Sequence, residues 1–306
     1  MPARYAEARN EVFPKIDRPG GSYRYEEQPS KGDKKMSNSS SKGTALITGA
    51  SRGIGAVYAH RLAKRGFDLI LVAHSVEPLN ALAASLSSAS GRHITSIVAD
   101  LNNETDLAKV ETKLKDDPSI TMLVNNAGFA SVAPLLEADI RKMQDMIALN
   151  VTVLTRLTYA AAPAFVKRRT GTIINIGSAA GISVEALNGV YGASKAYVLA
   201  FSLSLQHELT SKGIRVQAVL PARTATDGWN VAGLPWQQQP ASIIMPVEDM
   251  VDAALVGLDQ GELVTIPPLH DGDEWTRFEA IRRGMLPQFG TSVPVPRYRN
   301  QARRSA

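Results

Sequence analysis

The chain has 306 residues, of which 44% are hydrophobic and 21% are charged, as in an ordinary folded protein. The absence of cysteine excludes disulfides, thiolate nucleophiles and cysteine metal sites, and the five histidines lack metal-ligand spacing, so no metal is expected. No apolar run approaches the ~18 residues of a membrane span, so we expect a cytoplasmic protein with no membrane contact. The net charge of +5 lies largely in the two ends of the chain and predicts a scattered basic surface, not nucleic-acid binding.

The two ends of the chain differ in composition from its middle. Residues 1–42 are rich in Lys, Arg, Glu, Ser, Gly and Pro and poor in aliphatic residues. Such a segment buries too little apolar surface to offset the entropy lost on ordering, so we expect a disordered N-terminal extension. Residues 267–306 form a C-terminal tail for which no definite structure is predicted. Its acidic cluster, His270-Asp-Gly-Asp-Glu274, is interpreted as a solvated turn and not as a metal site.

Between these ends, short apolar segments alternate with longer helical ones. Strands are expected at 44–48, 68–73, 94–99, 122–124, 172–176, 215–220 and 262–266. Helices are expected at 54–66, 77–89, 105–115, 140–167, 191–211 and 247–258, with a kink or break near Pro163 in the fourth. This alternation predicts an α/β fold, a Rossmann-like doubly wound parallel sheet of about seven strands with helices on both faces. We assign it to one catalytic domain over 43–266.

A glycine-rich turn follows the first expected strand and opens the first expected helix. Its sequence is Thr48-Gly-Ala-Ser-Arg-Gly-Ile-Gly55, with the spacing G-x-x-x-G-x-G. Glycines let the backbone turn tightly and approach a pyrophosphate, while the helix N-terminus offers free N–H groups and a partial positive charge. The turn therefore predicts a dinucleotide site, although its spacing differs from the usual G-x-G-x-x-G.

Tyr191 and Lys195 are four residues apart, so on a helix they share one face. A phenol ionises near pH ~10, and a neighbouring ammonium group lowers that pKa. Such a tyrosine exchanges a proton with an alcohol or ketone oxygen near neutral pH, and Ser178 is placed to hold the same oxygen by a hydrogen bond. The pair alone would equally suit a solvated helix face, so its meaning depends on the other motifs.

These motifs occur together, and in order, with Asn125-Asn-Ala-Gly128 and Asn150. In this combination the chain resembles the short-chain dehydrogenase/reductase family, in its commonest branch, over about residues 43–260. The resemblance implies that Tyr191 is the general acid or base, that Lys195 lowers its pKa and contacts the nicotinamide ribose, and that Ser178 orients the substrate oxygen. It also implies that Asn150 holds a water molecule of a proton relay; a satisfied core amide is the alternative.

The resemblance also implies most of the expected cofactor contacts. Together with two residues argued from charge below, they are Gly49, Ser51, Arg52, Gly53, Ile54, Gly55, His74, Asp100, Leu101, Asn126, Ala127, Gly128, Tyr191, Lys195, Pro221, Thr224 and Thr226. The chain departs from the family pattern after the sixth strand, where Ala222 replaces the usual glycine and Arg223 adds a charge. Residues 221–245 are expected to form a substrate lid, although Trp229 and Trp236 would equally serve only to anchor that segment.

The residues after the second strand indicate which cofactor is used. An NAD-specific site has Asp or Glu there to accept a hydrogen bond from the ribose 2′-hydroxyl. This chain has His74 and Ser75, and Arg52 of the glycine turn can reach the same ribose. A guanidinium group and an imidazole suit a 2′-phosphate, so we predict NADP in preference to NAD. The alternative is that Arg52 is solvated and His74 only caps a turn.

The predicted function is an NADP(H)-dependent oxidoreductase that interconverts a small-molecule carbonyl and a secondary alcohol. The alternative is a regulatory protein that binds the nicotinamide cofactor with little or no turnover. In this family the helices expected at 140–167 and 191–211 commonly pack against other copies, so the resemblance predicts a homodimer or homotetramer. Ala160–Ala162, Ala193, Ala196 and Ala200 supply small residues for that contact.

Overall fold

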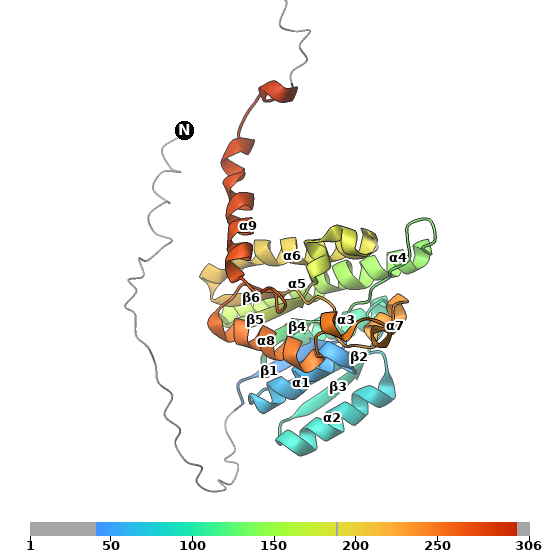
Figure 1. Ribbon diagram of the computed structural model, residues 1–306. Helices are drawn as coiled ribbons and strands as arrows, with labels where there is room; N and C mark the ends of the chain where they lie inside the picture. The colour runs from blue at the N-terminus through green and yellow to red at the C-terminus, as the bar shows by residue number, and fades with distance from the viewer. Residues whose placement is uncertain (1–40, 188, 299–306) are drawn as a thin grey trace, which may run out of the picture. The chain divides into compact units, whose positions relative to one another are not determined.

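The computed structural model describes residues 41–187 and 189–298, so the predicted extension over 1–42 lies almost entirely outside the described residues. Its centre is a seven-stranded sheet with the order β3-β2-β1-β4-β5-β6-β7 (Figure 1). Every neighbouring pair is parallel. The strands are β1 (Thr44–Thr48), β2 (Asp68–Ala73), β3 (Ile94–Val98), β4 (Ile120–Asn125), β5 (Gly171–Ile176), β6 (Ile214–Val219) and β7 (Val264–Thr265). The predicted doubly wound sheet is confirmed.

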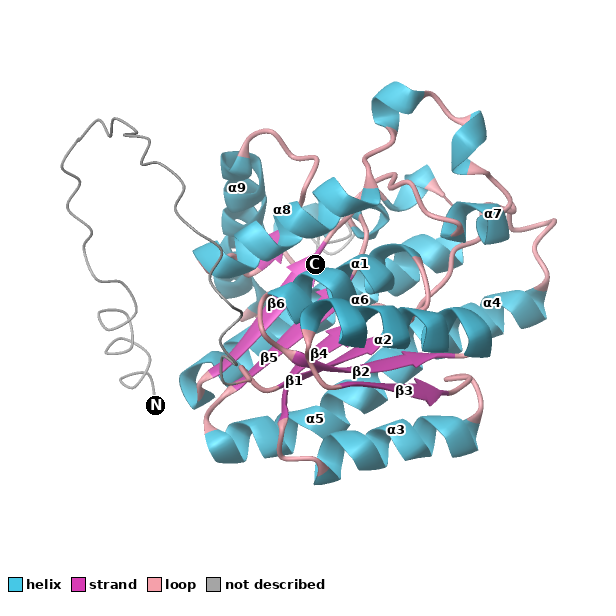
Figure 2. Cartoon of the chain, turned by 90° about the horizontal axis from the view of Figure 1, so that it is seen from below, coloured by secondary structure: helices cyan, strands magenta, loops and turns pink. Residues whose placement is uncertain are grey.

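Helices cover both faces of this sheet. They are α1 (Gly53–Lys64), α2 (Val76–Ser90), α3 (Glu104–Asp116), α4 (Ile140–Ile147), α5 (Leu154–Arg168), α6 (Gly189–Leu209), α7 (Gly228–Ala232), α8 (Val247–Gln260) and α9 (Gly272–Gly284). One apolar cluster joins α1, α2 and α8 to the sheet, and a second joins α3, α5 and α6 to the opposite face. Figure 2 shows α3 and α5 below the sheet and α1 and α2 above it. None of the described helices is long and apolar enough to cross a membrane.

The long helix predicted over 140–167 is interrupted, but not at the proline. Pro163 lies inside α5, which continues to Arg168. The irregularity is a π-helical segment, Ala148–Val153, between α4 and α5. Pro163 is on the exposed side of α5, where water can satisfy the carbonyl left without an N–H partner. The predicted break near Pro163 is therefore wrong in position, and the widened turn carries Asn150 instead.

The C-terminal tail contains a helix that the sequence pattern did not indicate. The Asp271 side chain accepts a hydrogen bond from the Asp273 N–H at 2.9 Å and so caps the start of α9. The acidic cluster over 270–274 is therefore a helix start, not a solvated turn. Among the described residues, no group of three or more acidic or histidine side chains is arranged to hold a metal ion.

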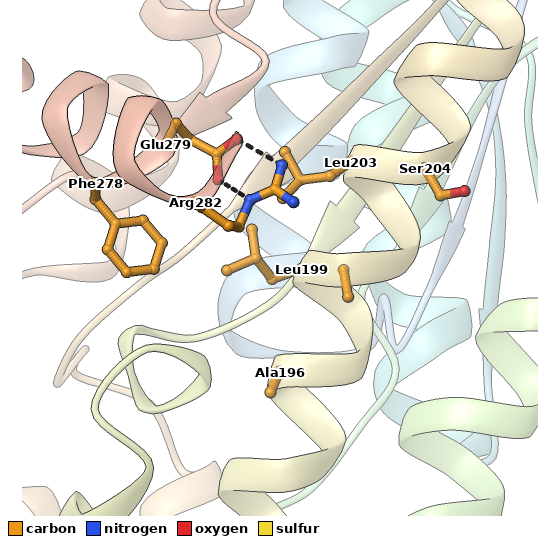
Figure 3. Close-up of a pocket in the computed structure, with 8 residues that line it drawn as sticks. Ala196, Leu199, Leu203, Ser204, Phe278, Glu279 and Arg282 are labelled. Atoms are coloured by element: carbon orange, nitrogen blue, oxygen red, sulfur yellow. Dashed lines mark hydrogen bonds and ion pairs between the residues drawn. The ribbon is translucent and has the colours of Figure 1, made fainter. Parts of the chain in front are cut away.

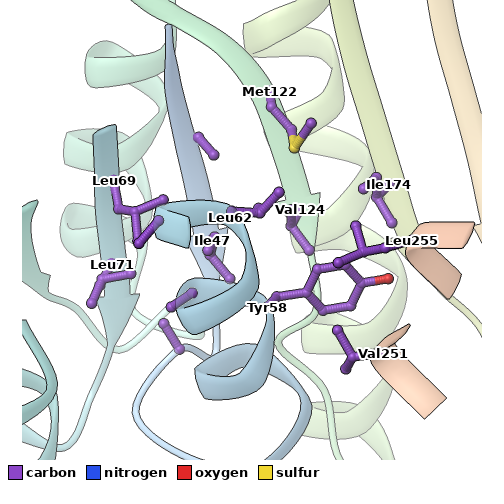
Figure 4. Packing of buried hydrophobic residues seen from close by; sticks show 14 of the residues in the cluster. Ile47, Tyr58, Leu62, Leu69, Leu71, Met122, Val124, Ile174, Val251 and Leu255 are labelled. Atoms are coloured by element: carbon purple, nitrogen blue, oxygen red, sulfur yellow. The ribbon is translucent and has the colours of Figure 1, made fainter. Parts of the chain in front are cut away.

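Tyr58 of α1 is fully buried between the sheet and α8 (Figure 4). Its ring packs in the cluster that contains Val124, Val251 and Leu255. Its hydroxyl group has no hydrogen-bond partner in the described part of the chain, and burial raises the pKa of the phenol, so it stays neutral. The apolar core around Tyr58 therefore contains a buried hydroxyl group that makes no hydrogen bond with the described residues.

We expect Tyr58→Phe to raise the free energy of unfolding by about 1 kcal/mol, because an unsatisfied buried polar group costs roughly 1–3 kcal/mol. Urea unfolding monitored by circular dichroism measures it. Tyr197→Phe is the matched control, since the Tyr197 hydroxyl is hydrogen-bonded to Thr155 at 2.8 Å on the surface, and it should lose a few tenths of a kcal/mol. A loss of stability in Tyr58→Phe would show that its hydroxyl has a partner, such as a buried water.

Candidate active site

The glycine turn lies between β1 and α1 and is held by the segment after β4. Gly49 and Gly53 have φ values of 64° and 55°, in the left-handed region that favours glycine. A Cβ atom on Gly55 would collide with the Gly49 carbonyl oxygen, so only glycine lets the turn close onto the helix. The N-cap position of α1, Arg52, gives the helix no side-chain cap. The first N–H groups of α1 therefore remain available to an anion.

Asn126 and Ala127, which follow β4, hold the glycine turn by hydrogen bonds. The Asn126 Nδ2 donates to the carbonyl oxygens of Thr48 (2.9 Å) and Gly49 (3.1 Å). The backbone N–H groups of Asn126 and Ala127 both donate to Thr48 Oγ1 at 3.0 Å. Ser51 lies in the turn itself, and Ile54 packs against the core under α1. The structure thus brings the predicted pyrophosphate residues together at the carboxyl ends of two central strands.

Three polar side chains meet beside the turn, where a ribose 2′-phosphate is expected. Arg52 Nη2 donates to Ser75 Oγ at 3.3 Å, and Ser75 Oγ lies 3.3 Å from His74 Nδ1. Within the described chain Arg52 has no carboxylate partner, although Glu77 follows in the first turn of α2. Ser75 was not among the expected contacts. Its hydroxyl lies between the Arg52 guanidinium group and the His74 imidazole ring.

The two residues expected near the adenine lie at the end of β3. Leu101 is buried in the second apolar cluster and cannot offer more than its backbone. Asp100 is exposed, and its carboxylate accepts from the Asn102 N–H at 3.0 Å. Its own N–H donates to Asp106 at 3.1 Å. The segment is therefore held in place by its own hydrogen bonds, with Asp100 at the surface.

Tyr191, Lys195 and Ser178 converge as the sequence predicts. Tyr191 and Lys195 share one face of α6, with Lys195 Nζ 5.9 Å from the centre of the Tyr191 ring. Lys195 is buried, and its Nζ donates to the Ile176 carbonyl oxygen at the end of β5 at 2.9 Å. Ser178, two residues further on, is hydrogen-bonded to the Tyr191 phenol. Its hydroxyl also donates to the Pro221 carbonyl oxygen at 3.4 Å.

Burial, not the ammonium group, dominates the electrostatics of this site. Desolvation raises the pKa of Tyr191, and the hydrogen bond with Ser178 lowers it by less. Burial also lowers the pKa of Lys195 to about 8. The predicted lowering of the phenol pKa by Lys195 is therefore wrong for the protein alone, because the ammonium group lies beside the ring and is itself desolvated. At neutral pH the Tyr191 phenol is therefore protonated.

Asn150 is held by three hydrogen bonds on the π-helical segment. Its Oδ1 accepts from the Phe129 N–H (3.1 Å), and its Nδ2 donates to the Phe129 carbonyl (3.0 Å) and to Ser194 Oγ (3.1 Å). A Cβ atom on Gly128 would lie 2.7 Å from Asn150 Oδ1 and 3.7 Å from Lys195 Nζ, so the glycine separates the two side chains. The water relay between them stays a prediction.

Ser194 is a residue of this site that the sequence did not single out. It is buried, it accepts from Asn150, and it donates to the Tyr191 carbonyl oxygen at 2.8 Å. It thus joins the segment that carries Asn150 to the helix that carries Tyr191. Its place in Tyr-Gly-Ala-Ser-Lys, inside the motif, is the only signal that the sequence contains.

The loop after β6 lies against the glycine turn. A Cβ atom on Gly53 would be 3.3 Å from Thr226 Cγ2, so the expected nicotinamide contact sits close to the pyrophosphate turn. Thr224 is buried and forms an isolated β-bridge with Met245. This bridge joins the two ends of the predicted lid over 221–245. Trp229 Nε1 donates to the Thr224 carbonyl at 2.9 Å, as the anchoring alternative requires. Arg223 donates to Gln239 of the same lid at 3.0 Å.

Lys195 makes the stability of the fold depend on pH. Its folded pKa, about 8, is below the ordinary value of 10.5, so between these values the unfolded chain binds more protons and stability rises with pH. The destabilisation is fully present below pH 8 and is relieved as pH approaches 10.5. Relative to Lys195→Met, we expect the wild type to gain on the order of 2 kcal/mol from about pH 7 to about pH 9.5 in urea unfolding. Parallel curves for the two proteins would contradict it.

The model of the short chain dehydrogenase family matches residues 43–233, and the chain belongs to this family. A short-chain dehydrogenase from Sphingobium yanoikuyae in complex with NADPH is 47% identical with a TM-score of 0.82, over 84% of this chain and 100% of that one. The bulky-bulky ketone specific alcohol dehydrogenase from Comamonas testosteroni is 41% identical with a TM-score of 0.79, over 85% of this chain and 100% of that one. The resemblance inferred from the motifs is confirmed.

A curated relative, the very-long-chain 3-oxoacyl-CoA reductase of Coccidioides immitis (strain RS), is 35% identical over 193 residues. The match covers 61% of this chain and 55% of that protein. The chain thus spans little more than half the length of this relative.

Proposed function

We propose that this chain reduces a ketone to a secondary alcohol, or carries out the reverse reaction, with NADP(H) as the hydride carrier. One observation carries the proposal. The Tyr191 phenol is hydrogen-bonded to Ser178 beside the buried Lys195, at the carboxyl ends of the parallel strands, where the glycine turn also lies. A protonated phenol next to a second hydroxyl is the arrangement that ketone reduction needs.

The residues present fit a nicotinamide dinucleotide with a 2′-phosphate. Gly49 and Gly55 let the turn pack closely on itself and on the segment after β4, and the uncapped start of α1 offers N–H donors to a pyrophosphate. Arg52 and Ser75 would hold the 2′-phosphate, and Thr226 would face the nicotinamide end. The NADPH complex of the Sphingobium yanoikuyae relative supports this choice. When bound, the cofactor supplies or accepts the hydride.

The side chains then divide the proton chemistry among them. Ser178 donates a hydrogen bond to the carbonyl oxygen and orients it. Tyr191 gives its phenolic proton to the same oxygen as negative charge develops there. A charged Lys195 stabilises the phenolate that results. Because its pKa is about 8, Lys195 is largely charged at neutral pH and can do so. Asn150 and Ser194 keep α6 in register with the π-helical segment.

The surroundings of the site favour an apolar ketone. Ile182 and Val184 come four and six residues after Ser178 and are 38% and 41% exposed, and the predicted lid contains the partly buried Trp229 and Trp236. An exposed aliphatic side chain beside a catalytic hydroxyl suits a substrate that brings its own apolar surface. The preference of the Comamonas testosteroni relative for bulky-bulky ketones supports this class.

A panel of ketones tests the proposal directly. NADPH and NADH oxidation is followed by absorbance for aryl, cyclic and open-chain ketones, with the matching alcohols in the reverse direction. Turnover with at least one apolar ketone is expected. Tight NADPH binding with no turnover across the panel would favour the regulatory alternative, and the predicted cytoplasmic location would need separate imaging.

A further inference from the structure

Helix α9 carries an apolar face that the rest of the described chain does not cover. Trp275 near its start packs against the cluster of Leu199, Leu220 and Val264 on α6 and the sheet. Beyond it, Phe278, Ile281, Met285 and Phe289 are 46%, 70%, 43% and 70% exposed. Their spacing of three and four residues places Phe278, Ile281 and Met285 along one side of α9, and Phe289 ends the short 3₁₀ turn Leu286–Phe289 that follows. Contiguous exposed apolar stripes mark interaction surfaces.

A cavity lies at the foot of this face. It has a volume of about 340 Å³ and lies between α6 and α9 (Figure 3). Its α6 wall is made of Ala196, Leu199, Ala200 and Leu203. On the α9 side Glu279 is paired with Arg282 at 2.7 Å and with Arg283 at 3.3 Å, so this end of the helix keeps a net positive charge. The cavity is open to solvent, and its apolar α6 wall leaves room for one or two large side chains.

The charges of α9 select how a second copy of the helix would lie on it. Its first turn is acidic, with Asp273 and Glu274, and its last turn is basic, with Arg282 and Arg283. An antiparallel pair brings each acidic turn opposite a basic turn and opposes the two helix dipoles. A parallel pair would bring like charges together. The face is therefore complementary to itself under a two-fold axis, as isologous dimers require.

We propose that two copies of this chain associate through antiparallel α9 helices, with Ile281 near the two-fold axis. Antiparallel packing places the end of each helix beside the start of the other. The partner's Met285 and Phe289 then reach the cavity against α6 and fill it. The four apolar side chains on each copy supply the contact, and the charged turns fix its direction.

This interface differs from the one that the family resemblance implied. Ala160 and Ala161 of α5 are 3% and 0% exposed and belong to the core of their own chain, so they cannot pack against another copy. Ala196 and Ala200 of α6 do remain accessible, and they line the cavity that the partner would fill. Ala162 of α5 and Ala193 of α6 also remain accessible, so the contact that the resemblance implies stays a prediction beside this one.

The first experiment measures association. Multi-angle light scattering and sedimentation equilibrium of the full chain should show a dimer, and Met285→Glu with Phe289→Glu should weaken it by ~100-fold, as expected when two buried anchors are lost. Leu135→Glu with Leu136→Glu is the matched control, because these residues are 83% and 97% exposed on a different loop. A monomeric wild type, or equal weakening by both pairs, overturns the proposal. A monomer that sediments with phosphatidylcholine vesicles would make α9 a membrane-binding face instead.

The second experiment maps the geometry by oxidation. The natural chain has no cysteine, so a single introduced thiol reports on one contact. Ile281→Cys should form a disulfide-linked dimer, whereas Ala280→Cys, exposed on the next residue and turned by ~100°, should stay monomeric on non-reducing gels. Absence of the Ile281 cross-link in a dimeric protein would show that the interface lies elsewhere.

A mixture of two cysteine variants shows whether the two α9 helices run antiparallel. Glu274→Cys and Gln288→Cys should cross-link to each other when mixed, because positions equally distant from Ile281 meet in an antiparallel pair. Neither variant should cross-link alone. Efficient self-cross-linking of Glu274→Cys would indicate parallel helices and overturn the arrangement proposed here. Each of these variants changes only exposed residues, so circular dichroism should show an unchanged fold.

Discussion

Tyr191→Phe is expected to lower kcat for ketone reduction by at least ~100-fold, since general acid catalysis is typically worth 10²–10⁴ in rate. The substitution keeps the ring that packs beside Lys195 and removes only the proton that the ketone oxygen receives. Because burial holds the wild-type phenol in its protonated form, the loss should be largest in the direction of reduction. Initial rates of NADPH oxidation at saturating ketone measure it.

Two measurements separate a chemical loss from a structural one. NADPH binding, followed by quenching of tryptophan fluorescence, should be unchanged in Tyr191→Phe, because Lys195 keeps its hydrogen bond to Ile176. Tyr197→Phe, two positions beyond Lys195 on the exposed side of α6, should keep full turnover. Near-normal turnover in Tyr191→Phe would remove this residue from the reaction and with it the proposed mechanism.

The fold was predictable because the strands of a parallel sheet that is covered on both faces appear in the sequence as continuous apolar runs. Asp68–Ala73, buried at five of its six positions, shows this most clearly. The ends of the sheet were less predictable. The strand expected over 262–266 is reduced to Val264–Thr265, because β6 offers it only two paired residues at the sheet edge. Pairing length depends on the partner strand, which local sequence does not encode.

The meeting of Ser178, Tyr191 and Lys195 was predictable because two of them share one face of a helix and because the ordered motifs resemble those of the family. What the sequence missed are contacts that arise between elements. Ser75 is a site residue only because Arg52, 23 positions earlier, folds back onto it. Ser194 matters only because the π-helical segment brings Asn150 within 3.1 Å. Helix α9 depends on the docking of Trp275 on α6, and its polar first turn alone resembles a loop.

The cluster of Arg52, Ser75 and His74 gives the strongest expectation about cofactor specificity. Arg52→Ala should lower the preference for NADPH over NADH, in kcat/KM, by at least ~10-fold, because a hydrogen bond to a charged group is worth roughly 1.5–3 kcal/mol. Arg52 is exposed and, among the described residues, pairs only with the neutral Ser75 hydroxyl, so its removal should leave the fold and the NADH reaction nearly unchanged. Lys64→Ala, which removes an equal charge from the exposed end of α1, is the matched control and should keep the wild-type preference.

His74→Asp should go further and favour NADH. It introduces a carboxylate at the end of β2, where an acid accepts from the ribose 2′-hydroxyl and repels a 2′-phosphate. The wild-type cluster of Arg52, Ser75 and His74 contains no carboxylate, so the substitution adds a negative charge beside Arg52. Steady-state kinetics with both cofactors should therefore show KM for NADPH rising and KM for NADH falling. Equal use of the two cofactors by the unmodified protein, or an unchanged ratio in both variants, would show that the 2′-phosphate binds elsewhere.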